Sequence, residues 1–306
     1  MPKPDLSVLL GPLKLKNPVM TASGTFGFGA EWAEFFDLGN LGAIMVKAVT
    51  VKPRGGNPMP RMVETAGGTL NAIGLQNPGL DKFISEKMPY LRQYDTAIIV
   101  NIAADRMEDF NTLAETLDGV PGIAALEVNI SCPNQECGGI EFGVDPVLTE
   151  QVIASVRKRT KLPVIAKLSP NVTDISVIAR AAEAGGADIL SLINTFVGTS
   201  ISTRTRKFRI ANRTGGLSGP CIKPLALYMV WKVAQATKLP IIGMGGIATP
   251  DDAVEFMLAG ASAIATGTIN FVNPMAAVEI VKGIEAYCVS QNEARVSDII
   301  GTVTRM

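Results

Sequence analysis

The sequence predicts a single (β/α)8 barrel, in which eight parallel strands alternate with helices. Three observations support this prediction: a length of 306 residues, short apolar runs that recur along the chain, and helical periodicity between those runs. A chain of this length fits one large barrel better than two ordinary domains. We therefore expect residues 1–306 to form one domain, without a linker or a low-complexity stretch.

The apolar runs are the predicted strands. They are continuous rather than alternating, which is typical of parallel strands that are buried on both faces. The eight runs are Val19–Ala22, Ile44–Ala48, Ala97–Ile102, Leu126–Ser131, Val164–Ser169, Ile189–Thr195, Ile241–Gly246 and Ala263–Thr268.

Segments with helical periodicity lie between these runs. Asp174 and the Thr249–Asp252 stretch are good helix starts, because Asp and Thr cap helices and proline suits the first turn. The predicted helices include Asp105–Leu117, Pro146–Thr160, Asp174–Ala184, Ile222–Ala236 and Pro250–Ala259.

Long connections follow the second and the sixth predicted strand, at residues 49–96 and 196–240, and a further long loop follows the fourth. Ordered loops of this length on a barrel are usually lids or binding loops, so we expect the first two to cover one face. Leu6–Leu15 precedes the first strand and has Gly11-Pro12 in its middle. This segment is predicted to form a hairpin that closes the opposite end.

Composition excludes several classes of function. Basic and acidic residues are equal at 28 each, so no net field attracts nucleic acid or an anionic membrane. No apolar run reaches the roughly 18 to 20 residues that cross a bilayer, and Met1–Lys16 does not resemble a signal peptide. The four cysteines lack the spacing of a disulfide framework, a zinc site or an iron–sulfur cluster. We expect a cytoplasmic protein without a metal.

The chain contains no histidine, so acid–base chemistry must use another group. Cys132 lies just beyond the fourth predicted strand, on the face where barrel enzymes act. An unperturbed thiol has a pKa of about 8.5, so it can remove a proton from a substrate at neutral pH. A lone cysteine is more often a small buried apolar residue. We expect Cys132 to act as a base or nucleophile, and Cys221 and Cys288 to be packing residues.

Polar residues or glycines end every predicted strand. Helix caps and turns explain one or two such residues but not a set on all eight strands, so we expect one binding site at this end of the barrel. The residues are Ser23, Lys47, Asn101, Asn129 with Cys132, Lys167, Asn194 with Thr195, Gly245 with Gly246, and Gly267 with Thr268.

The last two strand ends indicate a phosphate site. Gly243–Gly246 and Ala265–Thr268 match the barrel loops in which glycine lets backbone N–H groups approach a dianion. Lys47 and Lys167 lie in otherwise apolar strands, where each could bind an anion, stabilise a reduced ring or form a Schiff base. Amide side chains suit a planar ring with carbonyl and N–H edges, and Asn71, Asn101, Asn129, Asn134 and Asn194 supply them.

These residues together resemble a known family. From Leu6 to about Ile284 the chain resembles the catalytic subunit of class 1B dihydroorotate dehydrogenase, an FMN-binding barrel. The matching motifs are Ala22–Gly29, Lys47–Thr50, Asn71–Gly79, Asn129–Asn134, Gly138-Gly139, Phe142-Gly143, Asn194-Thr195, Gly215–Pro220 and the two phosphate loops. The chain departs from the family pattern after Thr195, where Phe196–Ser202 replaces the usual Gly-Met-Ala-Ile-Asp.

The resemblance implies the role of each matching residue. One FMN per chain would be held by Ser23, Lys47, Ala48, Asn101, Asn129, Lys167, Ile193, Gly219, Gly245, Gly246, Gly267 and Thr268. The substrate would be held by Lys47, Asn71, Ala72, Ile73, Gly74, Leu75, Asn129, Asn194 and Thr195. Cys132 would be the base that takes a proton from carbon 5 of dihydroorotate, while a hydride leaves carbon 6 for the flavin. Lys167 would stabilise the anionic reduced ring.

The resemblance also implies partners. Electrons would pass to NAD through a second subunit that carries FAD and a [2Fe–2S] cluster, with the catalytic chains as a homodimer within a heterotetramer. A fumarate-dependent class 1A homodimer, a dihydropyrimidine dehydrogenase, a Schiff-base lyase that uses Lys47 or Lys167, and a non-catalytic binding barrel remain alternatives.

Overall fold

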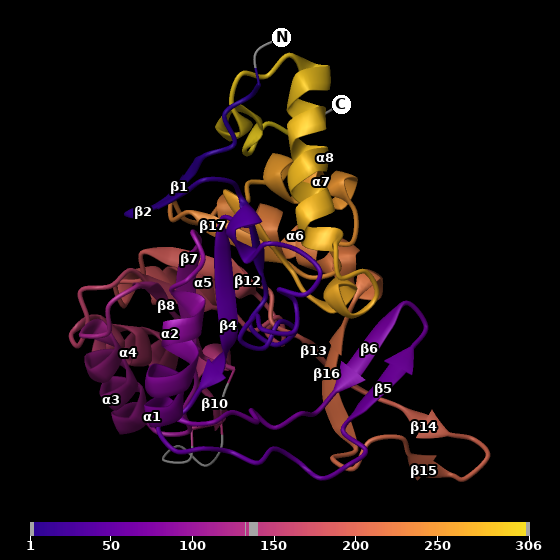
Figure 1. The fold of residues 1–306 in the computed structure, drawn as a ribbon. Coiled ribbons are helices and arrows are strands. Elements are labelled where there is room, and N and C mark those ends of the chain that lie inside the picture. The colour runs from indigo at the N-terminus through magenta and orange to yellow at the C-terminus, as the bar shows by residue number, and fades with distance from the viewer. Residues whose placement is uncertain (1–2, 132, 135–139, 304–306) are drawn as a thin grey trace.

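The computed structural model describes residues 3–131, 133–134 and 140–303 (Figure 1). The eight predicted strands form one closed parallel barrel, which confirms the predicted fold class. Around the barrel the strands are β3 (Val19–Thr21), β4 (Ala43–Val49), β7 (Ala97–Ile102), β8 (Ile123–Asn129), β11 (Val164–Lys167), β12 (Ile189–Leu192), β17 (Ile241–Met244) and β18 (Ala263–Thr266).

Several predicted strand boundaries were wrong by two or three residues. β8 begins at Ile123 rather than Leu126, because pairing with Ile98 of β7 extends the ladder. β12 ends at Leu192 rather than Thr195: the backbone N–H groups of Ile193 and Asn194 still bond neighbouring strands but have left the regular ladder. β11, β17 and β18 each end two residues before the predicted position. The residues just beyond β12, β17 and β18 line the cavity described below.

Helices cover the outside of the barrel. The Asp174 carboxylate accepts a hydrogen bond from the Ser176 backbone N–H at 2.9 Å, and Thr249 forms a capping box with Asp252, so both predicted helix starts are confirmed. The five predicted helices are α3 (Met107–Asp118), α4 (Pro146–Arg157), α5 (Ile175–Ala184), α6 (Lys223–Ala234) and α7 (Pro250–Leu258). The structure adds α8 (Ala276–Gln291) after the last strand and the short α1 (Leu80–Lys82) and α2 (Met88–Leu91).

The two longest loops form a single antiparallel sheet, here called the loop sheet. Its strand order is β13 (Phe196–Thr199), β16 (Thr214–Ser218), β6 (Gly68–Asn71) and β5 (Met62–Thr65). β16 from the second loop pairs directly with β6 from the first, with Gly216 opposite Asn71. The sheet lies at the end of the barrel away from the chain termini, and β14 (Ile201–Ser202) and β15 (Lys207–Phe208) extend beyond it (Figure 1).

The N-terminal hairpin closes the other end, as predicted. It consists of β1 (Val8–Leu10) and β2 (Leu13–Leu15), joined through Gly11. Gly11 has φ +55°, and a Cβ atom there would lie 3.3 Å from the carbonyl oxygen of Asp188, the residue before β12. The turn therefore lies against the N-terminal end of a barrel strand and requires a glycine.

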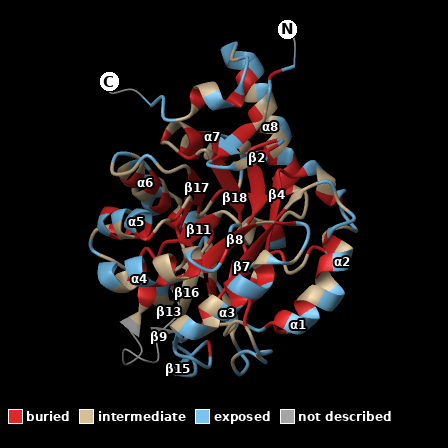
Figure 2. Cartoon of the chain, turned by 90° about the vertical axis from the view of Figure 1, so that its left-hand side faces the viewer, coloured by how far each residue is buried: buried red, intermediate tan, exposed pale blue. Residues whose placement is uncertain are grey.

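Buried residues concentrate on the barrel strands (Figure 2). The two charged exceptions are Glu127, which is 0% exposed, and Lys167, which is 6% exposed. Cys288 is buried as expected, whereas Cys221 is exposed, so the expectation that it packs in the core was wrong. It follows Pro220 in the turn that leads into α6, outside the barrel core. No helix in the described part of the chain is long and apolar enough to span a membrane.

Candidate active site

A cavity of about 660 Å³ opens at the C-terminal ends of the barrel strands. Met62, Thr69 and Asn71 of the loop sheet border it from the other side. The described residues that the resemblance assigns to FMN or to the substrate all line this cavity: Ser23, Lys47, Ala48, Asn71, Ala72, Ile73, Gly74, Leu75, Asn101, Asn129, Lys167, Ile193, Asn194, Thr195, Gly219, Gly245, Gly246, Gly267 and Thr268. Cys132 lies outside the described residues. The structure thus brings the residues together, and their binding roles remain predictions.

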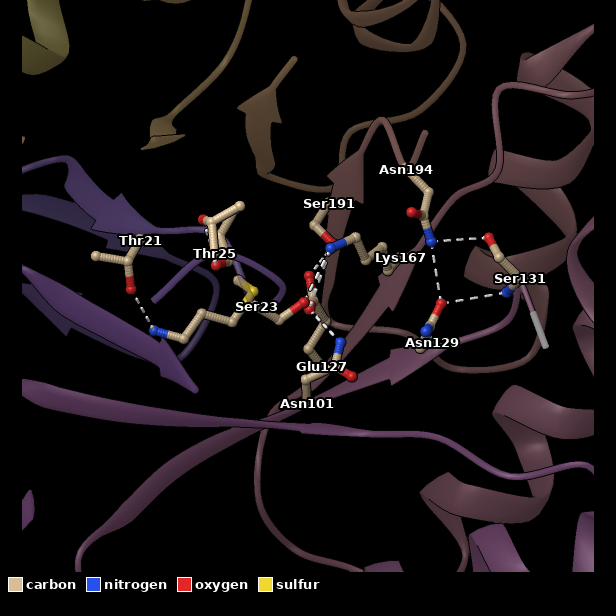
Figure 3. A network of polar contacts seen from close by, with 12 residues as sticks. Thr21, Ser23, Thr25, Asn101, Glu127, Asn129, Ser131, Lys167, Ser191 and Asn194 are labelled. Carbon is tan, nitrogen blue, oxygen red and sulfur yellow. Dashed lines mark hydrogen bonds and ion pairs between the residues drawn. The ribbon is translucent and has the colours of Figure 1, made fainter. Parts of the chain in front are cut away.

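Lys167 forms part of a buried polar network at the cavity floor (Figure 3). Its ammonium group donates a hydrogen bond to Ser23 Oγ at 3.1 Å and lies 3.8 Å from a carboxylate oxygen of Glu127. Glu127 also accepts hydrogen bonds from Asn101 Nδ2 at 2.5 Å and from Ser191 Oγ at 2.6 Å. A buried charge is tolerated when it is paired and hydrogen-bonded, which this network achieves for both ions.

Asn101 carries the one atom of this network that is left without a partner. Its Nδ2 is bonded to Glu127, but its Oδ1 is buried and has no hydrogen-bond partner. An unsatisfied buried acceptor costs roughly 1–3 kcal/mol. Because Asn101 lines the cavity, a ligand with an N–H group could satisfy this oxygen.

A second group of amides lies beside the lysine network (Figure 3). Asn194 Nδ2 donates to Asn129 Oδ1 at 3.1 Å and to Ser131 Oγ at 3.0 Å, while Asn194 Oδ1 accepts from the Thr195 N–H at 2.9 Å. These bonds fix the orientation of both amide planes. The arrangement suits recognition of a flat ring by directed donors and acceptors.

Lys47 differs from Lys167 in its surroundings. It is half-buried in the cavity, and burial lowers the pKa of Lys47, with a further lowering by the nearby Arg61 guanidinium. Arg61 lines the same cavity and donates to the carbonyl oxygen of Asn57 at 3.3 Å. The two side chains make this side of the cavity positive, which suits a carboxylated ligand.

The loop that follows β6 is braced from behind by Asn77. This side chain is buried, and its Oδ1 accepts from the N–H groups of Thr50 and Gly79, while its Nδ2 donates to Thr50 Oγ1 and to the Leu75 carbonyl oxygen. Asn71 itself donates to the carbonyl oxygen of Gly216 at 3.2 Å, across the loop sheet. Asn77 therefore holds the segment 71–75 against the cavity without lining it.

One of the two predicted phosphate loops requires glycine. Gly245 has φ +122°, and a Cβ atom there would lie 2.7 Å from Ala226 Cβ. Gly246 has φ +83°, and its Cβ would lie 2.8 Å from the Lys223 backbone. Gly267 is different, because the nearest atom to an added Cβ is Ala22 Cβ at 3.9 Å. Gly245 and Gly246 are thus fixed by the protein itself, and the space beside Gly267 is open.

Sequence reasoning missed several residues of the site. Glu127 and Ser191 lie beneath the floor, and Glu127 shows the same signal that singled out the lysines, a charge within an otherwise apolar strand. Further lining residues also escaped: Trp32, Arg61, Thr69, Ser218, Met244 and Phe271. Thr69 and Ser218 face each other at 3.3 Å across the loop sheet, a pairing without a local sequence signal.

Comparison with known proteins gives consistent matches. The sequence profile of the family described as dihydroorotate dehydrogenase matches residues 6–288. The chain is 55% identical over 303 residues, 99% of each chain, to dihydroorotate dehydrogenase B (NAD(+)), catalytic subunit, from Geotalea uraniireducens. Proteins of the same name are 54% identical in Pelobacter propionicus and 53% identical in a Thermoanaerobacter species, each covering 98% of this chain and 99% of the relative.

Proposed function

The chain belongs to the dihydroorotate dehydrogenase family, and from this membership we propose that it oxidises dihydroorotate to orotate in pyrimidine biosynthesis, with NAD as the final electron acceptor. One observation supports the proposal most directly. A single cavity gathers the phosphate loops and Lys167 on the barrel side with amides and Lys47 around the same space. A phosphate-bearing cofactor and a carboxylated ring can therefore meet there.

FMN is the cofactor that we propose, one per chain. Gly245, Gly246, Gly267 and Thr268 would hold its phosphate, and the unpartnered Asn101 Oδ1 would accept an N–H of its ring. Bound FMN supplies the hydride acceptor for the reaction. The remaining cofactor contacts would come from Ser23, Lys47, Ala48, Asn129, Lys167, Ile193 and Gly219.

The substrate would be held by the amides and by Lys47. Asn71, Asn129 and Asn194 have fixed orientations, and Lys47 with its positive charge attracts the carboxylate. The segment Ala72–Leu75 with Thr195 would complete the pocket. A dihydropyrimidine without the carboxylate would gain nothing from Lys47, so dihydroorotate is the substrate that this cavity suits better.

Cys132 is the proposed base that takes the proton from carbon 5. Replacement of Cys132 with Ser should leave FMN bound but remove most activity near neutral pH, with partial recovery in alkali, because a hydroxyl is a far weaker acid than a thiol. Cys221→Ser is the matched control, since Cys221 is exposed outside the cavity. Turnover like that of the unmodified protein in the Cys132 variant would reject the assignment.

We further propose a partner subunit that carries FAD and a [2Fe–2S] cluster, and an assembly of two catalytic chains within a heterotetramer in the cytoplasm. The proposal is supported by the words "catalytic subunit" in the names of the relatives and by a sequence without the cysteine spacing of a cluster site. We also propose that residues 1–306 act as one domain. For the proposed partner subunit, reduction of NAD only in its presence would support the proposal, and direct turnover with fumarate would overturn it.

The first test is a visible absorption spectrum of the purified protein, followed by anaerobic addition of dihydroorotate. Flavin absorption that bleaches on addition is the expected result. Bleaching only with dihydrouracil would move the substrate to the uncarboxylated ring. A colourless protein that fails to bind added FMN would reject the flavoenzyme proposal, and trapping with borohydride and a phosphorylated sugar would then test Lys47 as a Schiff-base lysine.

A further inference from the structure

Glu127 is a fully buried carboxylate that the proposed reaction leaves without a task. It belongs to β8, whose other side chains from Ile123 to Val128 are apolar, and it is 0% exposed. A buried carboxylate is expensive unless it is paired, and apolar residues of similar volume often stabilise a core better than a buried ion pair. Fold stability alone therefore does not account for a charge at this position.

The strand register explains how the charge is held. Asn101 lies directly opposite Glu127 on β7, and Ser191 lies directly opposite Lys167 on β12. Four consecutive strands, β7, β8, β11 and β12, thus place one polar side chain each in the same region of the barrel interior (Figure 3). The result is a preorganised layer in which each ion has a neutral neighbour and a charged one.

The carboxylate also restricts the position of Lys167. The ammonium group is held between Glu127 at 3.8 Å and Ser23 Oγ at 3.1 Å, and Lys167 is only 6% exposed. Lys167 and Ser23 both line the cavity, whereas Glu127 and Ser191 do not. Glu127 therefore acts on a ligand through Lys167 and Asn101, which it contacts, and through the field of its charge.

We propose that Glu127 is a positioning residue: its carboxylate fixes the Lys167 ammonium group at the cavity floor and balances its charge, which sets how strongly the cavity favours negative charge on a bound flavin. This inference rests on the proposed function, where Lys167 is assigned to FMN. With Glu127 ionised the pair has no net charge, so the ring meets the field of a dipole. Without the carboxylate it meets an uncompensated cation, which stabilises an anionic ring more strongly.

Glu127→Gln is the decisive variant, because the amide keeps the shape and can still bond Asn101 and Ser191. The readout is sulfite binding to the oxidised FMN protein at pH 6.5, since sulfite adds to the flavin and leaves a negative charge on the ring. The variant should bind sulfite about tenfold more tightly, which corresponds to a flavin potential about 30 mV more positive.

Two matched controls separate charge from structure. Ser191→Ala removes one hydrogen bond to the same carboxylate but keeps its charge, and sulfite binding should change by less than about twofold. Glu127→Gln placed in a Lys167→Met background should tighten sulfite binding less than it does beside Lys167, because only the direct field of the carboxylate is then removed. Equal effects of Glu127→Gln and Ser191→Ala, or an unchanged sulfite affinity in Glu127→Gln, would overturn the proposal.

Thermal unfolding of the protein without FMN distinguishes failure of this inference from failure of the proposed function. The single variants Glu127→Gln and Lys167→Met each leave one buried charge unpaired, and the double variant leaves none. The unfolding temperature of the double variant should be no lower than that of the less stable single variant, even if FMN does not bind at all. If the decreases in unfolding temperature of the two single variants add up in the double variant, the two side chains do not act as a pair and the inference is overturned.

Discussion

The two sides of the cavity are built in different ways. The barrel side presents side chains from strand ends. Its members Ser23, Asn101 and Lys167 are at most 7% exposed. Lys167 is hydrogen-bonded to Ser23, and Glu127 links Lys167 to Asn101. The cover presents partly exposed side chains from two separate loops, such as Arg61 and Asn71 of the first and Ser218 of the second. A rigid, preorganised wall suits a ligand that stays bound, whereas a cover of loops suits one that enters and leaves in every turnover. We therefore assign the cofactor to the wall, and the substrate to the space between the wall amides and the cover.

The largest effect is expected on the wall, from Gly267→Val. The nearest atom to a Cβ built at Gly267 is Ala22 Cβ at 3.9 Å, so the branched side chain of valine would extend into ligand space. Loss of two hydrogen bonds to a charged phosphate, at about 1.5–3 kcal/mol each, should weaken FMN binding by roughly 100-fold or more. Fluorescence titration of the protein with FMN measures the change.

The control for this variant is Gly119→Val, at the end of α3, where an added Cβ also has open space. It should leave FMN affinity and unfolding temperature unchanged. If Gly267→Val binds FMN as the unmodified protein does, the phosphate does not lie at this strand end and the division between wall and cover breaks down.

A smaller effect is expected where wall and cover meet, from the pH dependence of Lys47 on β4, whose neighbour Arg61 belongs to the cover. Its pKa is lowered by burial first and by the Arg61 charge second. Below that pKa the lysine is charged and attracts the carboxylate, and above it the charge is lost, so KM for dihydroorotate should rise about tenfold as the pH increases. Arg61→Gln removes one cause of the lowering, so the rise should move to higher pH.

The measurement is KM as a function of pH for both proteins, together with the FMN affinity of each. FMN affinity should stay the same in Arg61→Gln, because Arg61 belongs to the cover. A rise in KM that stays at the same pH in the variant would contradict the assignment of Lys47 to the carboxylate.

The smallest effect is expected from Asn77→Ala, which touches neither ligand. Loss of its bonds to Thr50 and Leu75 leaves buried backbone groups unsatisfied and should lower the free energy of unfolding by about 2 kcal/mol. The loosened segment 71–75 should raise KM for dihydroorotate about threefold and leave FMN affinity unchanged. Asn212→Ala, an exposed asparagine of the second long loop, serves as control. A weaker FMN affinity in Asn77→Ala would mean that wall and cover are coupled.

The barrel was predictable from sequence because parallel strands buried on both faces are continuous apolar runs, and all eight were found. The loop sheet was not, because strands such as Thr214–Ser218 contain two glycines and gain their stability from a partner about 145 residues away. Several strand ends were predicted two or three residues too late. The apolar run continues to Ile193 beside Asn194, although the regular strand pairing has already ended at Leu192.

The residues of the site also fall into those that the sequence could predict and those that only the folded structure brings together. Residues at strand ends, such as Lys167 and Gly245, could be found by position alone, since the barrel brings every strand end to one mouth. Glu127 was passed over because its partners lie on three other strands, and only the register of the closed barrel places them beside it. Arg61 was passed over because nothing local tells a loop arginine that lines a cavity from one in solvent.

The pairing of β6 with β16 has a consequence for engineering. In a strand pair, a slip of one residue turns every side chain to the opposite face. A change of length in either loop that slips this register would therefore turn Asn71 away from the cavity. In a chimera that takes only one loop from a relative with a different register, β6 and β16 would pair out of register even if the transplanted loop folds. Substrate preference in this scaffold should accordingly be exchanged by transplanting residues 49–96 and 196–240 together.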